Sequence, residues 1–359
     1  MIRLPFFSET APTRRRTVTV LLVDDSGFMR MALRKMLERD PAIRVVGEAT
    51  TGEEALRLAR VQRPDVVTMD VEMPGGGGLE ATRLIMEQCP TSIIMVSSLT
   101  KMAAATTLKA LACGAVDYIP KASSFVDLDI VAIEKELCRK IHYWAERRPL
   151  AKSTEVNKSS RPMQLSGAKP RGTPDLLLIG ASTGGPKLLP LMFRDLPRLP
   201  CPVVIALHMP PVYTQSFAEH LAADSGHDVI EGYDGIVLKA GQVVVAPGGT
   251  DSHLLPAGRN YSLRVKREDQ YGIHPSVDAL FLSAAQHARN PVAVVLTGMG
   301  DDGLRGGREL AKRQLPLLAQ NEETSLVYGM PRAVAEAGIA SEVLSTTMLV
   351  QRITQWCQP

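Results

Sequence analysis

Short apolar runs alternate with amphipathic stretches along the first third of the chain. Five of the runs are rich in Val, Ile and Leu and predict strands over residues 18–23, 43–47, 66–69, 93–96 and 115–119. Apolar residues at helical spacing between them predict helices over residues 28–38, 53–60, 79–87 and 102–111. Strands and helices that alternate in this way predict a doubly wound parallel sheet.

A second alternation of the same kind begins at residue 175, with its clearest strand runs over residues 176–179, 203–207, 243–246 and 292–296. The last run is almost entirely apolar, which is typical of a central parallel strand that is buried on both faces. We therefore expect an α/β chain that forms two doubly wound parallel sheets.

The stretch between the two alternations has a different composition. Residues 126–148 are able to form a last helix of the first half, and residues 149–174 are rich in Ser, Lys, Pro and Gly with hardly any large apolar residue. Such a composition predicts a flexible linker. We therefore divide the chain into an N-terminal extension (1–16), a first domain (17–148), a linker (149–174) and a second domain (175–359).

Polar residues follow the predicted strands of the first domain. Asp24 and Asp25 follow the first strand, Asp70 ends the third, Ser97 ends the fourth and Lys121 follows the fifth. The carboxyl ends of parallel strands meet at one edge of a sheet, so these side chains should lie close together. Three carboxylates there favour Mg²⁺, and a lysine and a hydroxyl beside it suit a phosphoryl group. Any one acid could simply cap a loop, so the prediction rests on the whole set.

The first strand of the second domain leads into a turn of small residues, 180–184, that contains Ser182. The turn fits the pattern G-x-S-x-G, which exposes a nucleophilic serine between a strand and a helix. A glycine-rich turn after a strand also binds phosphate groups through its backbone N–H groups. Taken alone, the stretch leaves three hypotheses open: a nucleophile, a phosphate loop and a structural turn.

Two further strand ends change the interpretation of Ser182. His208 follows the run 203–207, and Asp301 and Asp302 come shortly after the run 292–296. A serine hydroxyl needs a base to take its proton, and the base needs an acid to orient it. The spacing therefore favours a nucleophile, without choosing between Asp301 and Asp302. Because the order Ser, His, Asp differs from that of α/β-hydrolases, we expect a different fold with the same chemistry.

Composition and charge exclude several classes of function. The chain has 359 residues and a net charge of +3, which is too small to indicate a nucleic-acid-binding protein. Its five cysteines are scattered, which favours reduced thiols over disulfides or a zinc site. No apolar run reaches the ~20 residues of a membrane span, and no signal peptide is evident. We therefore expect a cytoplasmic protein that does not insert into membranes. The arginines at 14–16 fit a loose extension better than a targeting or nucleic-acid signal.

Residues 18 to about 135 resemble a response-regulator receiver domain, a flavodoxin-like fold. The matching segments are VDDS (23–26), VTMDVEMP (67–74), MVSS (95–98) and GAVDYIPK (114–121). The resemblance implies that Asp70 accepts a phosphoryl group from a histidine kinase and holds Mg²⁺ together with Asp24 and Asp25. It also implies that Ser97 and Lys121 act as switch residues at the phosphoryl group.

This first domain departs from the receiver pattern in two places. Four glycines at 75–78 stand where receivers usually carry Met-Asp-Gly, which predicts a softer loop beside Asp70. Ala122 follows Lys121 where receivers usually have a proline, so the local geometry of Lys121 is in question.

Residues 175 to about 345 resemble the Rossmann-like catalytic domain of the chemotaxis protein-glutamate methylesterase family. The matching segments are IGASTGGP (179–186), HMPP (208–211), TQSFA (214–218), APGG (246–249), PSVD (275–278), LTGMGDDG (296–303) and YGMP (328–331). The resemblance implies that Ser182 is the nucleophile, His208 the base and Asp302 the orienting acid. It places the backbone of Thr183 and Met299 at the oxyanion.

The resemblance also implies a function. The family demethylates glutamate methyl esters and deamidates glutamines on chemotaxis receptors, and a phosphorylated receiver uncovers the active site. The esterase reaction needs no cofactor. Two segments depart from the family's pattern: Ile273 and His274 replace a His-Arg pair before Pro275, and the loop after Gly249 continues through Asp251 in a longer form.

The sequence disfavours three other functions. A regulator with a DNA-binding output needs a basic helix-turn-helix, which the second half lacks. A nucleotide-binding domain with residues 180–185 as its phosphate loop lacks the spacing G-x-G-x-x-G. An inactive interaction module is disfavoured because the serine, histidine and aspartate are all present.

Overall fold

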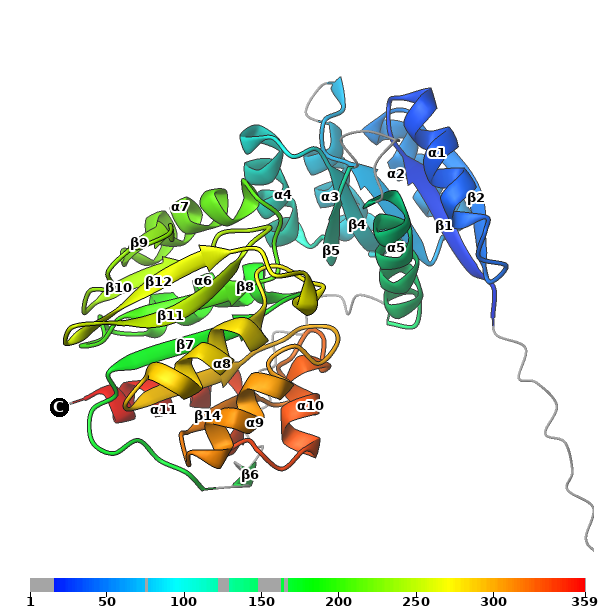
Figure 1. Ribbon diagram of the computed structural model, residues 1–359. Helices are drawn as coiled ribbons and strands as arrows, with labels where there is room; N and C mark the ends of the chain where they lie inside the picture. Colours follow the sequence, from blue (N-terminus) through cyan, green and yellow to red (C-terminus); the bar gives the residue numbers. More distant parts are fainter. Residues whose placement is uncertain (1–15, 75–76, 122–128, 148–162, 165–166, 359) are drawn as a thin grey trace, which may run out of the picture.

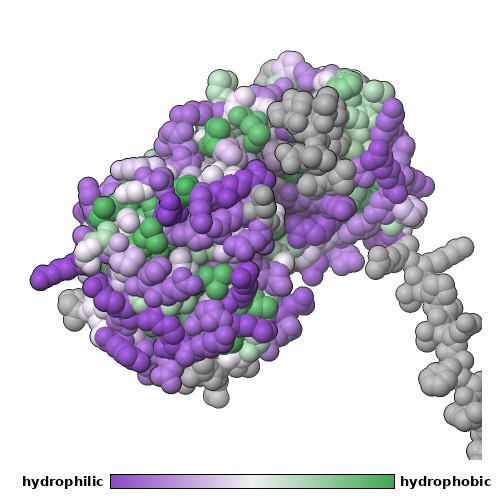
Figure 2. All heavy atoms as spheres, viewed as in Figure 1, coloured by the Kyte–Doolittle hydropathy of each residue, from purple (hydrophilic) through white to green (hydrophobic). Residues whose placement is uncertain are grey.

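A computed structural model describes residues 16–74, 77–121, 129–147, 163–164 and 167–358. Figure 1 shows two α/β bodies, one from each half of the chain, in contact along one side. Most of the surface visible in Figure 2 is hydrophilic, and hydrophobic residues occur there in small separate groups. Among the described residues, no helix is long and apolar enough to span a membrane.

The first body is a five-stranded parallel sheet in the order β2-β1-β3-β4-β5. Its strands are β1 (Val18–Val23), β2 (Ile43–Ala49), β3 (Val66–Asp70), β4 (Ser92–Ser97) and β5 (Asp117–Pro120). Its helices are α1 (Gly27–Leu37), α2 (Gly52–Gln62), α3 (Gly77–Gln88), α4 (Lys101–Cys113) and α5 (Asp129–Ala145). Buried side chains of α1 and α5 share one core, and those of α2, α3 and α4 share the other, so helices cover both faces.

The second body is an eight-stranded sheet in the order β6-β15-β14-β13-β7-β8-β10-β9, parallel except for β6. Its strands are β6 (Met163–Gln164), β7 (Leu176–Ala181), β8 (Val203–Leu207), β9 (Asp228–Glu231), β10 (Gln242–Val245), β13 (Pro291–Val295), β14 (Leu317–Gln320) and β15 (Glu342–Leu344). A separate antiparallel hairpin is formed by β11 (Asp251–Ala257) and β12 (Asn260–Lys266).

Helices cover both faces of this second sheet as well. Buried residues of α6 (Gly185–Asp195), α7 (Tyr213–Ser225) and α11 (Thr346–Cys357) share one core. The other core is formed with α8 (Val277–His287), α9 (Leu304–Lys312), α10 (Met330–Glu336) and the hairpin. The prediction of two doubly wound sheets is therefore confirmed. The antiparallel strand β6 and the hairpin were not expected, and β6 lies within the range predicted as the linker.

Half of the four-glycine segment, which was expected to form a soft loop, belongs to a helix. Gly77 and Gly78 belong to the first turn of α3, whereas 75 and 76 lie outside the described residues. A Cβ atom at Gly78 would lie 2.0 Å from the backbone oxygen of Asp70. Helix α3 is therefore able to start directly against the end of β3 because this position has no side chain.

The two bodies meet through aromatic side chains. The rings of Tyr118 on β5 and Tyr213 at the start of α7 stack with centroids 5.2 Å apart and planes 7° apart. The Tyr213 hydroxyl donates to the backbone oxygen of Ser98 at 3.1 Å, and the Tyr143 hydroxyl donates to that of Leu326 at 3.3 Å. Figure 1 shows α4 of the first body beside α7 of the second. One apolar cluster runs through Tyr118 and Tyr213 from one body into the other.

Candidate active site

The turn after β7 fixes the backbone of Ser182. Its N–H donates to the oxygen of Thr297 at 3.0 Å, and its own carbonyl oxygen accepts from the N–H of Gly185 at 2.8 Å. A Cβ atom at Gly298 would lie 2.9 Å from the Cβ of Ser182 and 2.3 Å from the sulfur of Met330. The turn therefore depends on small neighbours, and it places Ser182 at the carboxyl edge of the sheet.

His208 and Asp302 form a pair at the same edge. His208 directly follows β8, and its Nε2 lies 2.8 Å from Oδ2 of Asp302. A carboxylate only accepts hydrogen bonds, so Nε2 carries the hydrogen in this contact. In the neutral ring the other nitrogen, Nδ1, is then free to accept a proton.

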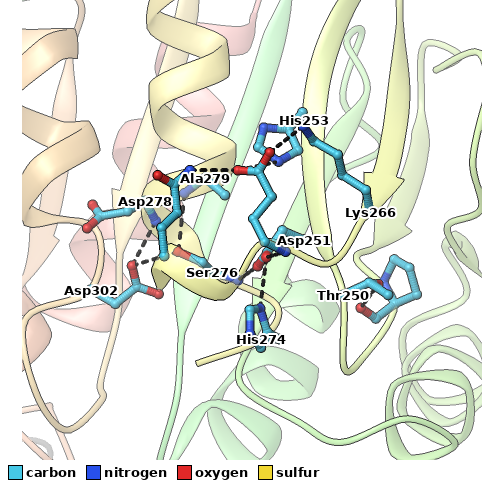
Figure 3. Close-up of polar contacts among 12 residues, drawn as sticks. Thr250, Asp251, His253, Lys266, His274, Ser276, Asp278, Ala279 and Asp302 are labelled. Atoms are coloured by element: carbon cyan, nitrogen blue, oxygen red, sulfur yellow. Dashed lines mark hydrogen bonds and ion pairs between the residues drawn. The ribbon is translucent and has the colours of Figure 1, made fainter. Parts of the chain in front are cut away.

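The first turn of α8 holds the Asp302 carboxylate. The carboxylate accepts from the N–H of Val277 at 2.7 Å, from that of Asp278 at 2.8 Å and from the Ser276 hydroxyl at 3.1 Å. Figure 3 shows Ser276 and Asp278 next to Asp302. Burial by itself would raise the pKa of Asp302. The hydrogen bonds from His208 and from the two backbone N–H groups outweigh burial and hold that pKa below its usual value.

Ser182 and His208 line the same cavity, which has a volume of about 540 Å³. Residues from both bodies form its walls. The second body contributes among others Thr183, Lys187, His208, Arg267 and His274, and the first contributes among others Asp117, Tyr118, Glu136, Arg139 and Lys140. The first body thus covers the cavity that holds the predicted nucleophile.

Both residues predicted at the oxyanion also line this cavity. Within the described part of the chain, the backbone N–H groups of Thr183 and Met299 donate no hydrogen bond. Unengaged N–H donors on the wall of the cavity that Ser182 lines are groups that an oxyanion would require.

Sequence spacing left Asp301 and Asp302 as equal candidates for the acid. The structure places Asp302 against His208, whereas Asp301 is exposed and its backbone oxygen accepts from the N–H of Leu304 at 3.0 Å. His227 lies in a different environment, with its Nε2 3.0 Å from the backbone oxygen of Phe193.

A buried polar network that sequence reasoning missed joins the two bodies next to Ser182. The Thr183 hydroxyl donates to Oδ2 of Asp117 at 3.2 Å, and Lys140 lies 2.9 Å from Oδ1 of the same carboxylate. Lys140 also lies 3.1 Å from Glu136. Burial alone would lower the pKa of Lys140, but its ion pairs with Asp117 and Glu136 outweigh burial and raise it. No local motif signals this contact, because its partners are far apart in the sequence.

The predicted carboxylates of the first body come together. Asp24, Asp25 and Asp70 each place an oxygen within 4.8 Å of the others. Lys121 reaches the same group, with Nζ 2.8 Å from Asp70 and 3.0 Å from Asp24, although Ala122 follows it. Burial raises the pKa of Asp70 above its usual value despite the opposing hydrogen bond from Lys121. The oxygen donors of three carboxylates fit a divalent cation such as Mg²⁺.

Ser97 lies at the end of β4 and is buried. Its hydroxyl oxygen accepts from the Thr107 hydroxyl on α4 at 2.9 Å, and its carbonyl oxygen accepts from the N–H of Lys121 at 2.7 Å. The next residue, Ser98, is the one that Tyr213 contacts from the second body. The predicted switch hydroxyl is thus one residue away from the interface.

Comparison with known proteins gives two family matches. Residues 177–353 match the family model of the CheB methylesterase, and residues 20–132 match that of the response regulator receiver domain. Two solved structures from Thermotoga maritima are each similar to part of this chain. Its CheB methylesterase catalytic domain is 33% identical, with a TM-score of 0.49, and the match covers 51% of this chain and 98% of that one. Its CheB response regulator domain is 46% identical, with a TM-score of 0.35, and the match covers 37% of this chain and 100% of that one.

Curated relatives match nearly the whole chain. A protein-glutamate methylesterase/protein-glutamine glutaminase of Oleidesulfovibrio alaskensis is 40% identical over 94% of this chain and 98% of its own length. The relative of the same name in Thermotoga maritima is 39% identical over 95% of this chain and 98% of its own length. The chain therefore belongs to the protein-glutamate methylesterase/protein-glutamine glutaminase family, with a receiver domain in front of its methylesterase domain.

Proposed function

We propose that this enzyme acts on glutamate methyl esters and glutamines of methyl-accepting chemotaxis receptors, with Ser182 as nucleophile, His208 as base and Asp302 as orienting acid. The observation that carries the proposal is the cavity that Ser182 shares with His208, whose Nε2 is held by Asp302. An imidazole fixed in this way supports attack by a serine hydroxyl.

The reaction proceeds in two steps. Ser182 Oγ attacks the ester carbonyl carbon while His208 Nδ1 takes the hydroxyl proton, and the proton then passes to the departing methoxy oxygen, so that methanol leaves. Water attacks the resulting acyl-enzyme with the same base, and the products are a glutamate carboxylate and free Ser182. With a glutamine substrate, ammonia leaves in place of methanol. The N–H groups of Thr183 and Met299 stabilise the negative oxygen, a contribution of about 3–4 kcal/mol per donor.

The test of this function is methanol release from purified, methylated chemotaxis receptors, measured with and without a small phosphodonor and Mg²⁺. We expect slow release from the full chain alone and faster release with phosphodonor. The absence of methanol under both conditions, from receptors that a related methylesterase does demethylate, would contradict the receptor assignment.

We also propose that the receiver domain inhibits the enzyme while it is unphosphorylated. Support comes from the position of its residues: Asp117, Glu136 and Lys140 form a wall of the active-site cavity, and Asp117 binds the Thr183 hydroxyl next to Ser182. A substrate polypeptide has to reach Ser182 through space that these side chains occupy. Opening of the interface between the domains would then be required for full activity.

Phosphorylation at Asp70 by a histidine kinase would provide the signal for opening. Asp24, Asp25 and Asp70 would hold Mg²⁺, which neutralises charge on the transferred phosphoryl group. Lys121, already 2.8 Å from Asp70, would pair with the phosphoryl oxygens. Ser97 is one residue from the Tyr213 contact, so a shift of this hydroxyl toward Asp70 would disturb the interface directly.

Replacement of Asp70 by Asn should leave basal esterase activity unchanged and abolish stimulation by the phosphodonor. Asn keeps the shape of the side chain but lacks the carboxylate oxygen that attacks phosphorus. Methanol release with and without phosphodonor measures both quantities, and a chelator should remove the stimulation of the wild-type chain in the same way. Full stimulation of Asp70→Asn would show that phosphorylation acts elsewhere.

Replacement of Tyr213 by Phe should raise basal activity about fivefold without phosphodonor. The variant keeps the ring that stacks on Tyr118 but loses the hydrogen bond to Ser98. Loss of a bond worth about 1 kcal/mol shifts the equilibrium between the closed and open forms about fivefold toward the open form. Tyr233→Phe, at an exposed tyrosine of the same domain, is the matched control and should leave the basal rate unchanged. Equal basal rates of Tyr213→Phe and wild type would contradict this role of the interface.

A further inference from the structure

Two segments in which the chain departs from the family's pattern meet beside the active site. One is the loop after Gly249 that continues into β11 and contains Asp251, and the other is the segment before Pro275 that contains His274. Nδ1 of His274 lies 2.8 Å from Oδ2 of Asp251. Figure 3 shows His274 next to Asp251, and Asp251 next to Ser276. The two departures thus form one structural unit.

Asp251 is fully buried and fixed by several donors. Its Oδ1 accepts from the N–H of Ser276 at 2.8 Å, and its Oδ2 accepts from the N–H of Glu268 at 3.1 Å in addition to His274. A buried carboxylate with three donors has little freedom to turn. The His274 ring, bound to it through Nδ1, is therefore held in one orientation.

This pair repeats the arrangement of the pair His208 and Asp302. Ser276 connects the two acids, because its N–H donates to Asp251 and its hydroxyl donates to Asp302 at 3.1 Å. One short segment at the start of α8 therefore positions two histidine–carboxylate pairs. His208 and His274 both line the cavity that contains Ser182.

The second ring nitrogen of His274, Nε2, is a hydrogen-bond acceptor. The contact with Asp251 requires the hydrogen on Nδ1, so Nε2 of the neutral ring is a hydrogen-bond acceptor. Among the described residues, Nε2 has no hydrogen-bond partner. The His274 side chain is 10% exposed, and His274 lines the cavity, so Nε2 is an unpartnered acceptor at a partly exposed position. An unpartnered acceptor on the wall of a substrate cavity is able to accept a hydrogen bond from a donor of the substrate.

We propose that His274 is a specificity-determining residue whose Nε2 accepts a hydrogen bond from an N–H group of the substrate polypeptide. The reacting ester group has only acceptor oxygens, so it cannot supply this donor. Two N–H sources remain, namely the side-chain amide of a glutamine substrate and a main-chain N–H next to the reacting residue. The inference rests on the proposed role of Ser182, because it assumes that substrate occupies the shared cavity.

Two replacements of His274 separate the contact with substrate from the contact with Asp251. His274→Asn places an amide N–H near the position of Nδ1, so it keeps the bond to Asp251 but has nothing at the position of Nε2. His274→Gln places its amide near the position of Nε2 and restores an acceptor in the cavity. His253→Asn is the matched control, since His253 on β11 lies 3.6 Å from Glu268 and is not part of the cavity wall.

The experiment uses the full chain with acetyl phosphate and Mg²⁺, and one chemotaxis receptor prepared in two forms, with methylated glutamates or with glutamines. Methanol and ammonia release give kcat and KM for each form. We expect His274→Asn to lower kcat/KM about tenfold, as for the loss of one substrate hydrogen bond, with recovery in His274→Gln and no change in His253→Asn. Loss with the glutamine form alone assigns the side-chain amide as donor, and equal loss with both forms assigns a main-chain N–H.

Unchanged kcat/KM of His274→Asn with both receptor forms would overturn the inference, and so would a loss confined to the methylated form. If His274→Asn does not fold, as judged by thermal unfolding, His274→Phe, which removes both contacts, is compared with His274→Gln, which restores only the acceptor at the position of Nε2. Ser182→Ala is assayed in parallel. An active Ser182→Ala variant means that the proposed function is wrong, whereas an inactive one beside a fully active His274→Asn means that only the role of His274 is wrong.

Discussion

Replacement of Ser182 by Ala should lower methanol release from methylated receptors by at least about 10⁴-fold. The variant removes the oxygen that is proposed to form the acyl-enzyme. His208 then has no hydroxyl proton to take at that position. Thr183 and Met299 would still bind the carbonyl oxygen, so a small residual rate above that of water is expected. The measurement is release of methanol with time, at saturating phosphodonor so that the receiver does not limit the rate.

A matched control is Ser225→Ala. Ser225 ends α7, and its hydroxyl donates to the backbone oxygen of Leu221 at 2.6 Å, outside the cavity. Ser225→Ala should keep wild-type activity. This result would show that the loss of activity in Ser182→Ala is specific to the position of that serine. A probe that modifies active serines should label wild type and Ser225→Ala but not Ser182→Ala. Wild-type activity of Ser182→Ala would contradict the nucleophile assignment.

The layout of both sheets could be predicted because their strands are buried on both faces. Runs such as residues 176–179 and 292–296 are apolar throughout and lie between helices with an apolar face, so periodicity alone marks them. The hairpin of β11 and β12 escaped prediction for the opposite reason. Only part of each strand is buried, β11 packs against α8, and Pro256 interrupts the pattern.

The positions of Ser182 and His208 could also be predicted, because each directly follows a parallel strand and strand ends share one edge. Contacts between residues of different loops could not be predicted in this way. Asp251 and His274 are 23 residues apart and meet only because the hairpin folds onto the start of α8. The same holds for Thr183 and Asp117, which belong to different domains.

For the glycine-rich segment after β3, the prediction from composition was incomplete. Four glycines predicted a soft loop because glycine has high backbone entropy. The sequence does not show that Gly78 packs against the backbone of Asp70, where a Cβ atom would come within 2.0 Å of the carbonyl oxygen. At this position the absence of a side chain permits close packing.

Replacement of Asp302 by Asn should lower kcat for methanol release by about 10⁴-fold, with a much smaller change in KM. The carboxylate accepts from His208 Nε2 and from the N–H groups of Val277 and Asp278, so it keeps the hydrogen on Nε2 and leaves Nδ1 as the base. An amide in its place presents one N–H₂ group, which favours the opposite tautomer of His208. The imidazolium that forms during attack also loses its negative partner.

The control for this prediction is a variant of the neighbouring residue, Asp301. Asp301→Asn removes the same charge one residue away, on an exposed side chain, and should leave kcat unchanged. Because the hydrogen bonds to Asp302 hold its pKa below the usual value, the carboxylate stays ionised as the pH falls through the range of an ordinary aspartate. Protonation of Asp302 should therefore not be the cause of any loss of activity between neutral pH and about pH 5. A large loss in Asp301→Asn together with an active Asp302→Asn would reverse the assignment of the acid.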